Sequence, residues 1–301
     1  MNENIFTNPM EAFPVLPPGR VVSLVPSVTA SLFDLGLGQT VVGVTEFCVA
    51  PAAQVQALPK IGGTKNPDVD AILRLRPDLV IANREENTQA AVEAIAAAGV
   101  PVWLAFPRTV REAMDDLYTT AQLFRSDIAL ERVQVLEQNA ELVALTVQGK
   151  QPTRYFCPIW QGNDGDTRWW MTFNDDTYPA NVLWWFGGAN VFGGRQRRYP
   201  LRADLGMGSA EDAGDRDVRY PRVTIEEVIA AQPELILLPD EPFPFDESHA
   251  AEIRDCFADT PAARKNQIYR IDGKAITWHG TRLAVALETL PELFLSDDIA
   301  F

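Results

Sequence analysis

A helix, a proline and a strand recur in this 301-residue chain at an offset of 156 positions. The first copy ends in RPDLVIAN, residues 76–83, and the second ends in QPELILLP, residues 232–239. The matching apolar pairs are Val69 and Ile225, Ile72 and Val228, and Leu73 and Ile229. A proline disfavours helix at the residue before it, and the apolar run that follows is typical of a buried parallel strand. Such units are common enough to coincide by chance, but the matching positions favour two similar lobes.

The first part of the chain alternates between strand and helix patterns. The expected strands are residues 20–25, 40–45, 78–83 and 101–106, and the expected helices are residues 27–36, 68–75, 86–99 and 109–124. This alternation predicts an α/β fold whose parallel sheet is covered by helices on both faces. The second part repeats the alternation, with strands at 153–160, 168–173, 234–239 and 267–271 and helices at 178–188, 224–231, 248–257 and from 281 onward.

Residues 126–148 contain neither glycine nor proline, and their apolar side chains recur at spacings of three and four. This periodicity predicts one long helix of roughly 33 Å. We therefore expect three parts, namely an N-terminal α/β lobe at 1–125, a connecting helix at 126–149 and a C-terminal α/β lobe at 150–301. The glycine-rich and charged segment 193–221 is expected to be an irregular surface connection.

Composition excludes several classes of protein. The net charge of −15 argues against binding to nucleic acid or to an anionic membrane surface. The three cysteines are far apart in the sequence and only two histidines occur, so neither a structural zinc site nor a histidine-rich metal site is expected. The first 20 residues do not resemble a signal peptide. The chain as written is thus expected to be cytoplasmic, or periplasmic if a leader was removed.

Ligands of open parallel sheets bind beyond the carboxyl ends of the strands. This rule selects loop residues in both lobes: Ser27, Phe47, Asn83, Arg84, Glu86 and Arg108 in the first, and Phe243, Trp278 and His279 in the second. Trp160 and Trp169 flank a polar turn, and for them a surface that stacks on a ligand is expected as often as packing in the core. Trp184 and Trp185 are expected in the core. His279 on its own is more often a satisfied polar residue than a ligand contact.

Catalytic motifs are absent: the sequence has neither a phosphate-binding G-x-x-x-x-G-K-[ST] loop nor a G-x-S-x-G nucleophile motif. NDGDT, residues 163–167, is expected to be a hairpin turn rather than a calcium loop. The pair Asp175-Asp176 is expected to cap the following helix. No catalytic and no metal-ligating residues are predicted.

Three N-terminal blocks carry a family resemblance: RVVSLVPSVTASLFDLGLGQTVVGVTEFC, PKIGGTKNPDVDAILRLRPDLVIANREEN and GVPVWLAF. With YPRVTIEEVIAAQPELILLPDEP and TWHGTRLAVALETL, the sequence resembles the solute-binding proteins of cobalamin and iron–siderophore ABC importers, also called helical-backbone metal receptors. The resemblance implies two Rossmann-like lobes joined by one rigid helix, with a ligand clasped between them. It also implies docking to a dimeric ABC permease through Asp70 and Glu226, although acids in the first turn of a helix have a purely structural explanation as well.

The resemblance implies a monomeric receptor with no intrinsic cofactor, whose ligand is cobalamin or another metal chelate. Thr64 and Asn83 stand where known cobalamin binders have aromatic residues, so the ligand need not be intact cobalamin. A ferric siderophore or haem is the alternative, and the cations that would pair with an anionic chelate are Lys65, Arg84, Arg108 and Arg282. A further alternative is a cytoplasmic corrinoid-handling protein or an enzyme on the same fold, which would use Arg84, Glu85, Glu86 and His279.

Overall fold

The structure is a computed structural model that describes residues 3–295. The last six residues of the predicted C-terminal lobe therefore lie outside the described part. The chain forms two compact units. The N-terminal unit contains the chain up to Ala140 together with Trp278–Ala284, and the C-terminal unit contains Glu141–Thr277 with the chain from Val285 onward.

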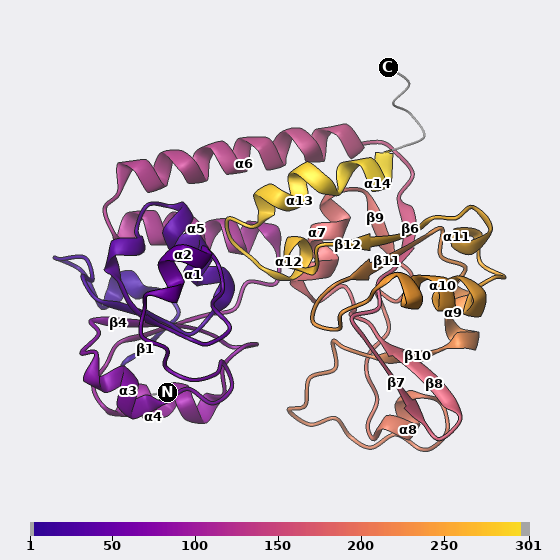
Figure 1. The fold of residues 1–301 in the computed structure, drawn as a ribbon, viewed down its shortest axis with the longest axis horizontal. Coiled ribbons are helices and arrows are strands. Elements are labelled where there is room, and N and C mark those ends of the chain that lie inside the picture. Colours follow the sequence, from indigo (N-terminus) through magenta and orange to yellow (C-terminus); the bar gives the residue numbers. More distant parts are fainter. Residues whose placement is uncertain (1–2, 296–301) are drawn as a thin grey trace. The chain divides into compact units, whose positions relative to one another are not determined.

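The N-terminal unit is built on a five-stranded parallel sheet in the order β1-β5-β4-β2-β3. Its strands are β1 (Ile5–Phe6), β2 (Val21–Ser23), β3 (Val41–Val44), β4 (Leu79–Asn83) and β5 (Val102–Ala105). Its helices are α1 (Pro26–Asp34), α2 (Ala52–Gln56), α3 (Val69–Arg74), α4 (Gln89–Ala97) and α5 (Val110–Leu123), with 3₁₀ turns at Pro9–Glu11 and Gly38–Thr40. Helices α3 and α4 cover one face of the sheet, and α1 and α5 cover the other (Figure 1). The predicted strands and helices of this part are confirmed.

The C-terminal unit contains two sheets. A four-stranded parallel sheet has the order β12-β11-β6-β9, and a three-stranded antiparallel sheet has the order β10-β8-β7. The strands are β6 (Thr153–Phe156), β7 (Trp160–Asp164), β8 (Thr167–Met171), β9 (Gly188–Asn190), β10 (Arg222–Thr224), β11 (Leu235–Pro239) and β12 (Ile268–Ile271). The helices are α7 (Tyr178–Trp185), α8 (Leu201–Asp204), α9 (Ile225–Ala231), α10 (Glu247–Cys256), α11 (Pro261–Arg264), α12 (Gly273–Thr277), α13 (Leu283–Thr289) and α14 (Pro291–Leu295).

The internal repeat is a repeat of structure. Strand β4 lies between β5 and β2, with β3 beyond, and β11 lies between β12 and β6, with β9 beyond. The strands β4 and β11 follow α3 and α9, at the offset seen in the sequence. Each of these helices ends in a left-handed residue directly before the proline, Arg76 with φ of 46° and Gln232 with φ of 47°. Proline disfavours the right-handed helical conformation at the preceding residue, so each unit ends its helix in the same way.

The connecting helix α6 (Asp127–Val147) is unbroken over 21 residues, as its sequence predicts (Figure 1). Its buried side chains are Ala129, Val133, Leu136 and Ala140, all of which belong to the predicted apolar stripe. Within the described residues 3–295, no helix has both the length and the apolarity needed to cross a lipid bilayer.

Three local predictions were wrong, and one helix was not predicted. The run TRYFCPIW is two strands in different sheets, because Pro158 lacks an N–H donor and interrupts the ladder between β6 and β7. Trp184 is 66% exposed rather than in the core. Thr177, not the Asp175-Asp176 pair, caps α7, since its side chain accepts the Ala180 N–H. The segment Gly273–Thr277, which carries no strong periodicity, forms α12.

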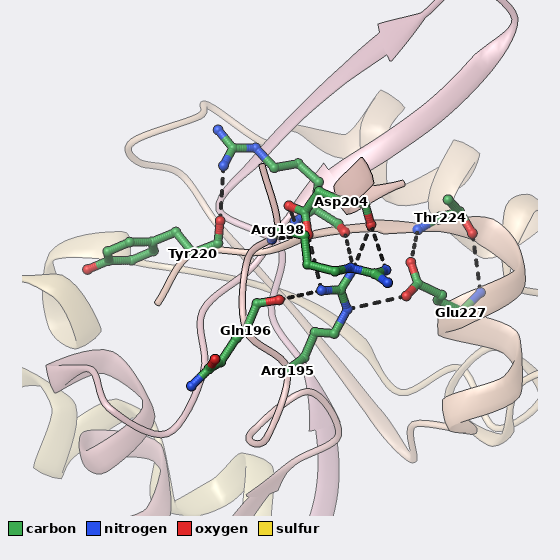
Figure 2. Close-up of polar contacts among 8 residues, drawn as sticks. Arg195, Gln196, Arg198, Asp204, Tyr220, Thr224 and Glu227 are labelled. Carbon is green, nitrogen blue, oxygen red and sulfur yellow. Dashed lines mark hydrogen bonds and ion pairs between the residues drawn. The ribbon is translucent and has the colours of Figure 1, made fainter. Parts of the chain in front are cut away.

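The segment 193–221 is more ordered than an irregular connection, because it folds around one buried carboxylate (Figure 2). The side chain of Asp204 is fully buried and forms an ion pair with Arg195 at 3.1 Å. Its two oxygens accept the backbone N–H groups of Arg198, at 2.9 Å, and of Arg222, at 2.8 Å. Arg195 also contacts Glu227, at 3.4 Å, in the first turn of α9. Asp204 thereby ties this segment to the start of β10 and to α9.

Candidate functional site

In the N-terminal unit, the predicted site residues gather around Asn83 at the carboxyl end of β4. The Asn83 side chain is buried, and its Oδ1 accepts the N–H of Glu85 at 2.7 Å. Asn87 accepts the Asn83 N–H at 2.8 Å and donates to the Thr64 carbonyl oxygen at 2.9 Å. These bonds order the loop 83–87 and fix it against the loop that carries Thr64.

His279 lies against two of the predicted residues. Its Nε2 is 3.2 Å from Ser27 Oγ and 3.3 Å from Asn83 Nδ2. The bond from Glu85 to Asn83 Oδ1 orients the amide, so Nδ2 is the atom that faces the imidazole and can only donate to it. His279 Nε2 is therefore an acceptor, and the neutral ring carries its proton on Nδ1. Burial lowers the pKa of His279 from 6.5 to about 4, in agreement with a neutral ring.

The cations of this unit also come together. The guanidinium groups of Arg84 and Arg108 each lie 5.9 Å from the centre of the Phe106 ring. Both side chains are exposed, so one aromatic ring positions two positive charges at the surface. Lys65 instead donates to the carbonyl oxygen of Glu85. Sequence reasoning missed Phe106, although its place between two loop cations at the end of a strand was a usable signal.

Phe47 supplies exposed apolar surface near the same loops. Its side chain is 59% exposed, and a Cβ built on Gly63 would lie 3.4 Å from its ring. Thr64 follows directly and is half-buried. Glu86 and Trp278 are also half-buried, and the structure places Trp278 beside His279 in the N-terminal unit.

In the C-terminal unit, the predicted aromatic residues form one cluster. The rings of Trp160 and Phe243 meet edge to face with centroids 5.5 Å apart, and Trp160 is 42% exposed. Phe243 also contacts Phe245 at 4.7 Å and His249 at 5.2 Å. Packing from behind holds Trp160 in place while part of its ring stays accessible, as a stacking residue requires.

Trp169 lies on the same face of the antiparallel sheet as Trp160, because β7 and β8 pair Trp160 with Met171 and Gly162 with Trp169. A Cβ on Gly162 would come within 2.5 Å of the Trp169 ring, so glycine leaves the space that this ring occupies. The guanidinium group of Arg222 lies 5.8 Å from the Trp169 ring centre. Arg222 was not predicted as a site residue, since nothing in the sequence pairs it with a tryptophan 53 positions away.

The two predicted docking carboxylates occupy equivalent places. Asp70 lies in the first turn of α3 and Glu226 in the first turn of α9, and both are exposed. Hydrogen bonds to its own backbone N–H and to Thr224 hold the pKa of Glu226 below its usual value. Glu227, rather than Glu226, completes the capping box with Thr224. Glu226 is thus not needed for the cap.

Metal-ligating side chains do not cluster in the described residues 3–295, where no group of three or more histidine, cysteine, aspartate or glutamate side chains could hold an ion. The three cysteines are free thiols, of which Cys48 and Cys157 are buried.

Comparison with known proteins identifies the family. The family described as "Periplasmic binding protein" matches residues 21–275. The vitamin B12-binding protein of Vibrio vulnificus (strain CMCP6) is 24% identical over 298 residues, which cover 97% of this chain and 94% of that protein. The one from Yersinia pestis (strain Pestoides F) is 26% identical over 220 residues, which cover 73% of this chain and 69% of that protein.

Two solved structures show the same fold. The periplasmic vitamin B12 binding protein of Vibrio cholerae has a TM-score of 0.72 at 22% identity, covering 93% of this chain and 97% of that one. A periplasmic haem-binding protein from Roseiflexus sp. RS-1 has a TM-score of 0.69 at 22% identity, covering 91% and 97%. Because the family match extends over most of the sequence, the chain belongs to the periplasmic binding protein family.

Proposed function

We propose that this protein is the substrate-binding receptor of an ABC importer and that it binds a corrinoid such as vitamin B12 without performing chemistry on it. The curated relatives named vitamin B12-binding proteins support this ligand. In this proposal the ligand contacts come from loops at the carboxyl ends of strands, and the protein works outside the cytoplasm, where an importer's receptor meets its ligand.

The observation that carries the proposal is the partly exposed aromatic surface of the C-terminal unit. Trp160, braced by Phe243, offers a rigid ring of the kind that packs against a large macrocycle.

The geometry of His279 supports a receptor over an enzyme. Ser27 and His279 are close enough for a nucleophile and its general base. The same Nε2, however, also accepts from the Asn83 amide, and a pKa of about 4 makes the imidazole a weak base at neutral pH. Ser27 is also only 4% exposed. These features suit recognition better than acyl transfer.

Haem is the second candidate ligand, because several solved structures with this fold are haem-binding proteins. Arg84 and Arg108 favour an anionic ligand, and haem carries two carboxylates. Direct comparison of cyanocobalamin and haem, by titration of intrinsic fluorescence, ranks the two.

The binding test uses two exposed tryptophans of the same unit. Cyanocobalamin should quench the fluorescence of the wild-type protein with one ligand per chain. Trp160→Ala should weaken binding about 30-fold, the effect of losing a central aromatic contact, whereas Trp184→Ala should leave it unchanged. If cyanocobalamin, haem and ferric chelates all fail to change the fluorescence or the melting temperature, the ligand proposal is wrong.

Docking to the permease is tested separately. The double replacement of Asp70 and Glu226 by arginine should abolish association with the permease dimer in detergent or nanodiscs while ligand affinity stays the same. Glu93→Arg, at an exposed position of α4, is the matched control. Unchanged association of the double variant would refute docking through these carboxylates without touching the ligand proposal.

A further inference from the structure

One half-buried carboxylate of the N-terminal unit, that of Asp116, lies beside the buried face of its helix. Asp116 is on α5, between the buried residues Ala113, Leu117 and Thr120, which recur at helical spacing. Among the hydrogen bonds and ion pairs of the described residues, none involves its carboxylate. The Thr120 hydroxyl donates to the backbone oxygen of Asp116 instead, at 2.8 Å.

Asp116 lines a small, partly open cavity of about 20 Å³. The cavity is lined by residues of α1, β4, β5, α5 and the segment Trp278–Ala284; its polar members are Ser31, Trp103, Asp116, Thr120 and His279. A water molecule needs about 10–15 Å³ of such space and two to four polar partners. The cavity therefore has the size and the lining for one water molecule.

Trp103 supplies independent evidence that something polar belongs there. Its side chain is 3% exposed, and its indole Nε1 is buried without a hydrogen-bond partner in the described residues. A buried N–H without an acceptor costs about 1–3 kcal/mol. A water molecule between Trp103 Nε1 and the Asp116 carboxyl group would satisfy both.

The cavity touches His279, whose Nε2 is engaged by Ser27 and Asn83. The neighbouring residues hold this segment firmly on α1. Thr281 contacts Ser31 through its backbone N–H, at 3.1 Å, and its hydroxyl donates to Asp34 at 2.7 Å. The imidazole of His279 is therefore held in place, and a change of charge at the cavity acts on it at a fixed position.

We propose that the cavity is a binding site for one ordered water, through which the carboxyl group of Asp116 positions His279 and sets its charge environment. With Asp116 protonated, all groups around the water are neutral. Loss of the Asp116 proton to solvent places a negative charge near the imidazole and favours the protonated form of His279. Asp116 is in this sense a positioning residue and not a ligand contact.

The electrostatic surroundings support this role. Burial, with the neighbouring charges of Asp115 and Glu112, raises the pKa of Asp116 from 3.8 to about 7. The lining strands β4 and β5 bring no charged residue to the cavity. Charged groups on the elements around α5 include Glu11 of the 3₁₀ turn Pro9–Glu11, which packs on α5, and Asp34 at the end of α1. Arg282 lies in the segment with His279. Arg132 and Glu137 lie on α6, where Arg132 donates to the Asp34 carbonyl and Glu137 accepts from Tyr118.

The chain's two histidines make the test sharp. In ¹⁵N-labelled protein without ligand, the imidazole nitrogens of His249 and His279 give two sets of signals, which His249→Gln assigns. We expect His279 to show the Nδ1–H form and to shift with a single inflection between pH 6 and 8. Asp116→Asn, which mimics the protonated acid, should abolish that inflection, whereas Asp115→Asn, one position away and exposed, should keep it.

The water is detected separately by a cross-peak from a long-lived water to the indole N–H of Trp103. The proposal is overturned if wild-type His279 shows no inflection between pH 6 and 8, if the inflection persists in Asp116→Asn, or if the Trp103 cross-peak is absent. The wild-type measurements decide the question even if a variant does not fold. They use no ligand, so they stand apart from the corrinoid proposal.

Discussion

Replacing Asp204 by asparagine should destabilise the C-terminal unit by about 3–5 kcal/mol, the usual effect of removing one partner of a buried ion pair. The Asp204 side chain is fully buried, and its partner Arg195 is 17% exposed. Both carboxylate oxygens accept backbone N–H groups, one from Arg198 (Figure 2) and the other from Arg222. An asparagine has one acceptor oxygen, so its NH₂ group must face one of these N–H groups however the amide is turned.

The matched control is Asp217→Asn. Asp217 also pairs with an arginine, Arg219 at 2.6 Å, but its side chain is 42% exposed, and such pairs contribute about 0–1 kcal/mol. Urea denaturation followed by tryptophan fluorescence compares the two variants. In thermal melts, the loss in Asp204→Asn corresponds to roughly 6–20 °C, at about 2–4 °C per kcal/mol for a unit of this size.

Limited trypsin digestion provides a local readout, because the segment 193–222 is rich in arginine. Asp204→Asn should be cleaved there well before the rest of the chain, and Asp217→Asn should resemble the wild type. If Asp204→Asn stays within about 1 kcal/mol of the wild type and resists trypsin, the buried carboxylate does not organise this segment.

Further predictions concern pH and packing. The folded state keeps the Asp116 proton up to about pH 7, whereas the unfolded chain loses it near pH 4, so the free energy of unfolding falls as pH rises from about 4 to 7. The fall should be about 1–3 kcal/mol after solvent screening, and urea titrations of Asp116→Asn should not show it. Folded His279 stays neutral down to about pH 4, so the free energy of unfolding falls as pH drops from 6.5 to 4. His279→Asn should remove this pH dependence. Gly162→Ala should cost about 1–3 kcal/mol and alter Trp169 fluorescence, whereas Gly194→Ala, with open space around it, should do neither.

The sequence predicted the repeated part of the fold well, for a physical reason. A strand buried on both faces must be apolar along its whole length, and a helix that packs on it must show apolar residues at helical spacing. Both constraints act on α3 with β4 and on α9 with β11, so the two copies keep one pattern. The long helix α6 was predictable for the same reason, since its apolar stripe is unbroken by glycine or proline.

Long-range polar contacts were not predictable. The order of the segment 193–221 depends on Asp204, and its residue type does not distinguish it from the exposed acids of the same stretch, namely Glu211, Asp212, Asp215 and Asp217. Asp116 is similar, because its neighbour Asp115 makes the pair look like a solvated face. A usable signal was present, because Asp116 lies three residues after Ala113 and four before Thr120, both of which face the core.

The candidate site residues of the two units differ in chemistry: those of the C-terminal unit are mainly aromatic, and those of the N-terminal unit are mainly polar or charged. The C-terminal unit presents aromatic area, whose contribution grows with the apolar surface covered and depends little on which macrocycle covers it. The N-terminal unit presents exposed cations at Arg84 and Arg108 and a neutral imidazole at His279, whose contributions depend on where a ligand carries charge or acceptors. Four parallel strands of the two units share one order, and the C-terminal unit adds the antiparallel sheet whose strands β7 and β8 carry Trp160 and Trp169. Affinity is therefore expected to follow the aromatic residues, and selectivity between a corrinoid and haem to follow the polar ones.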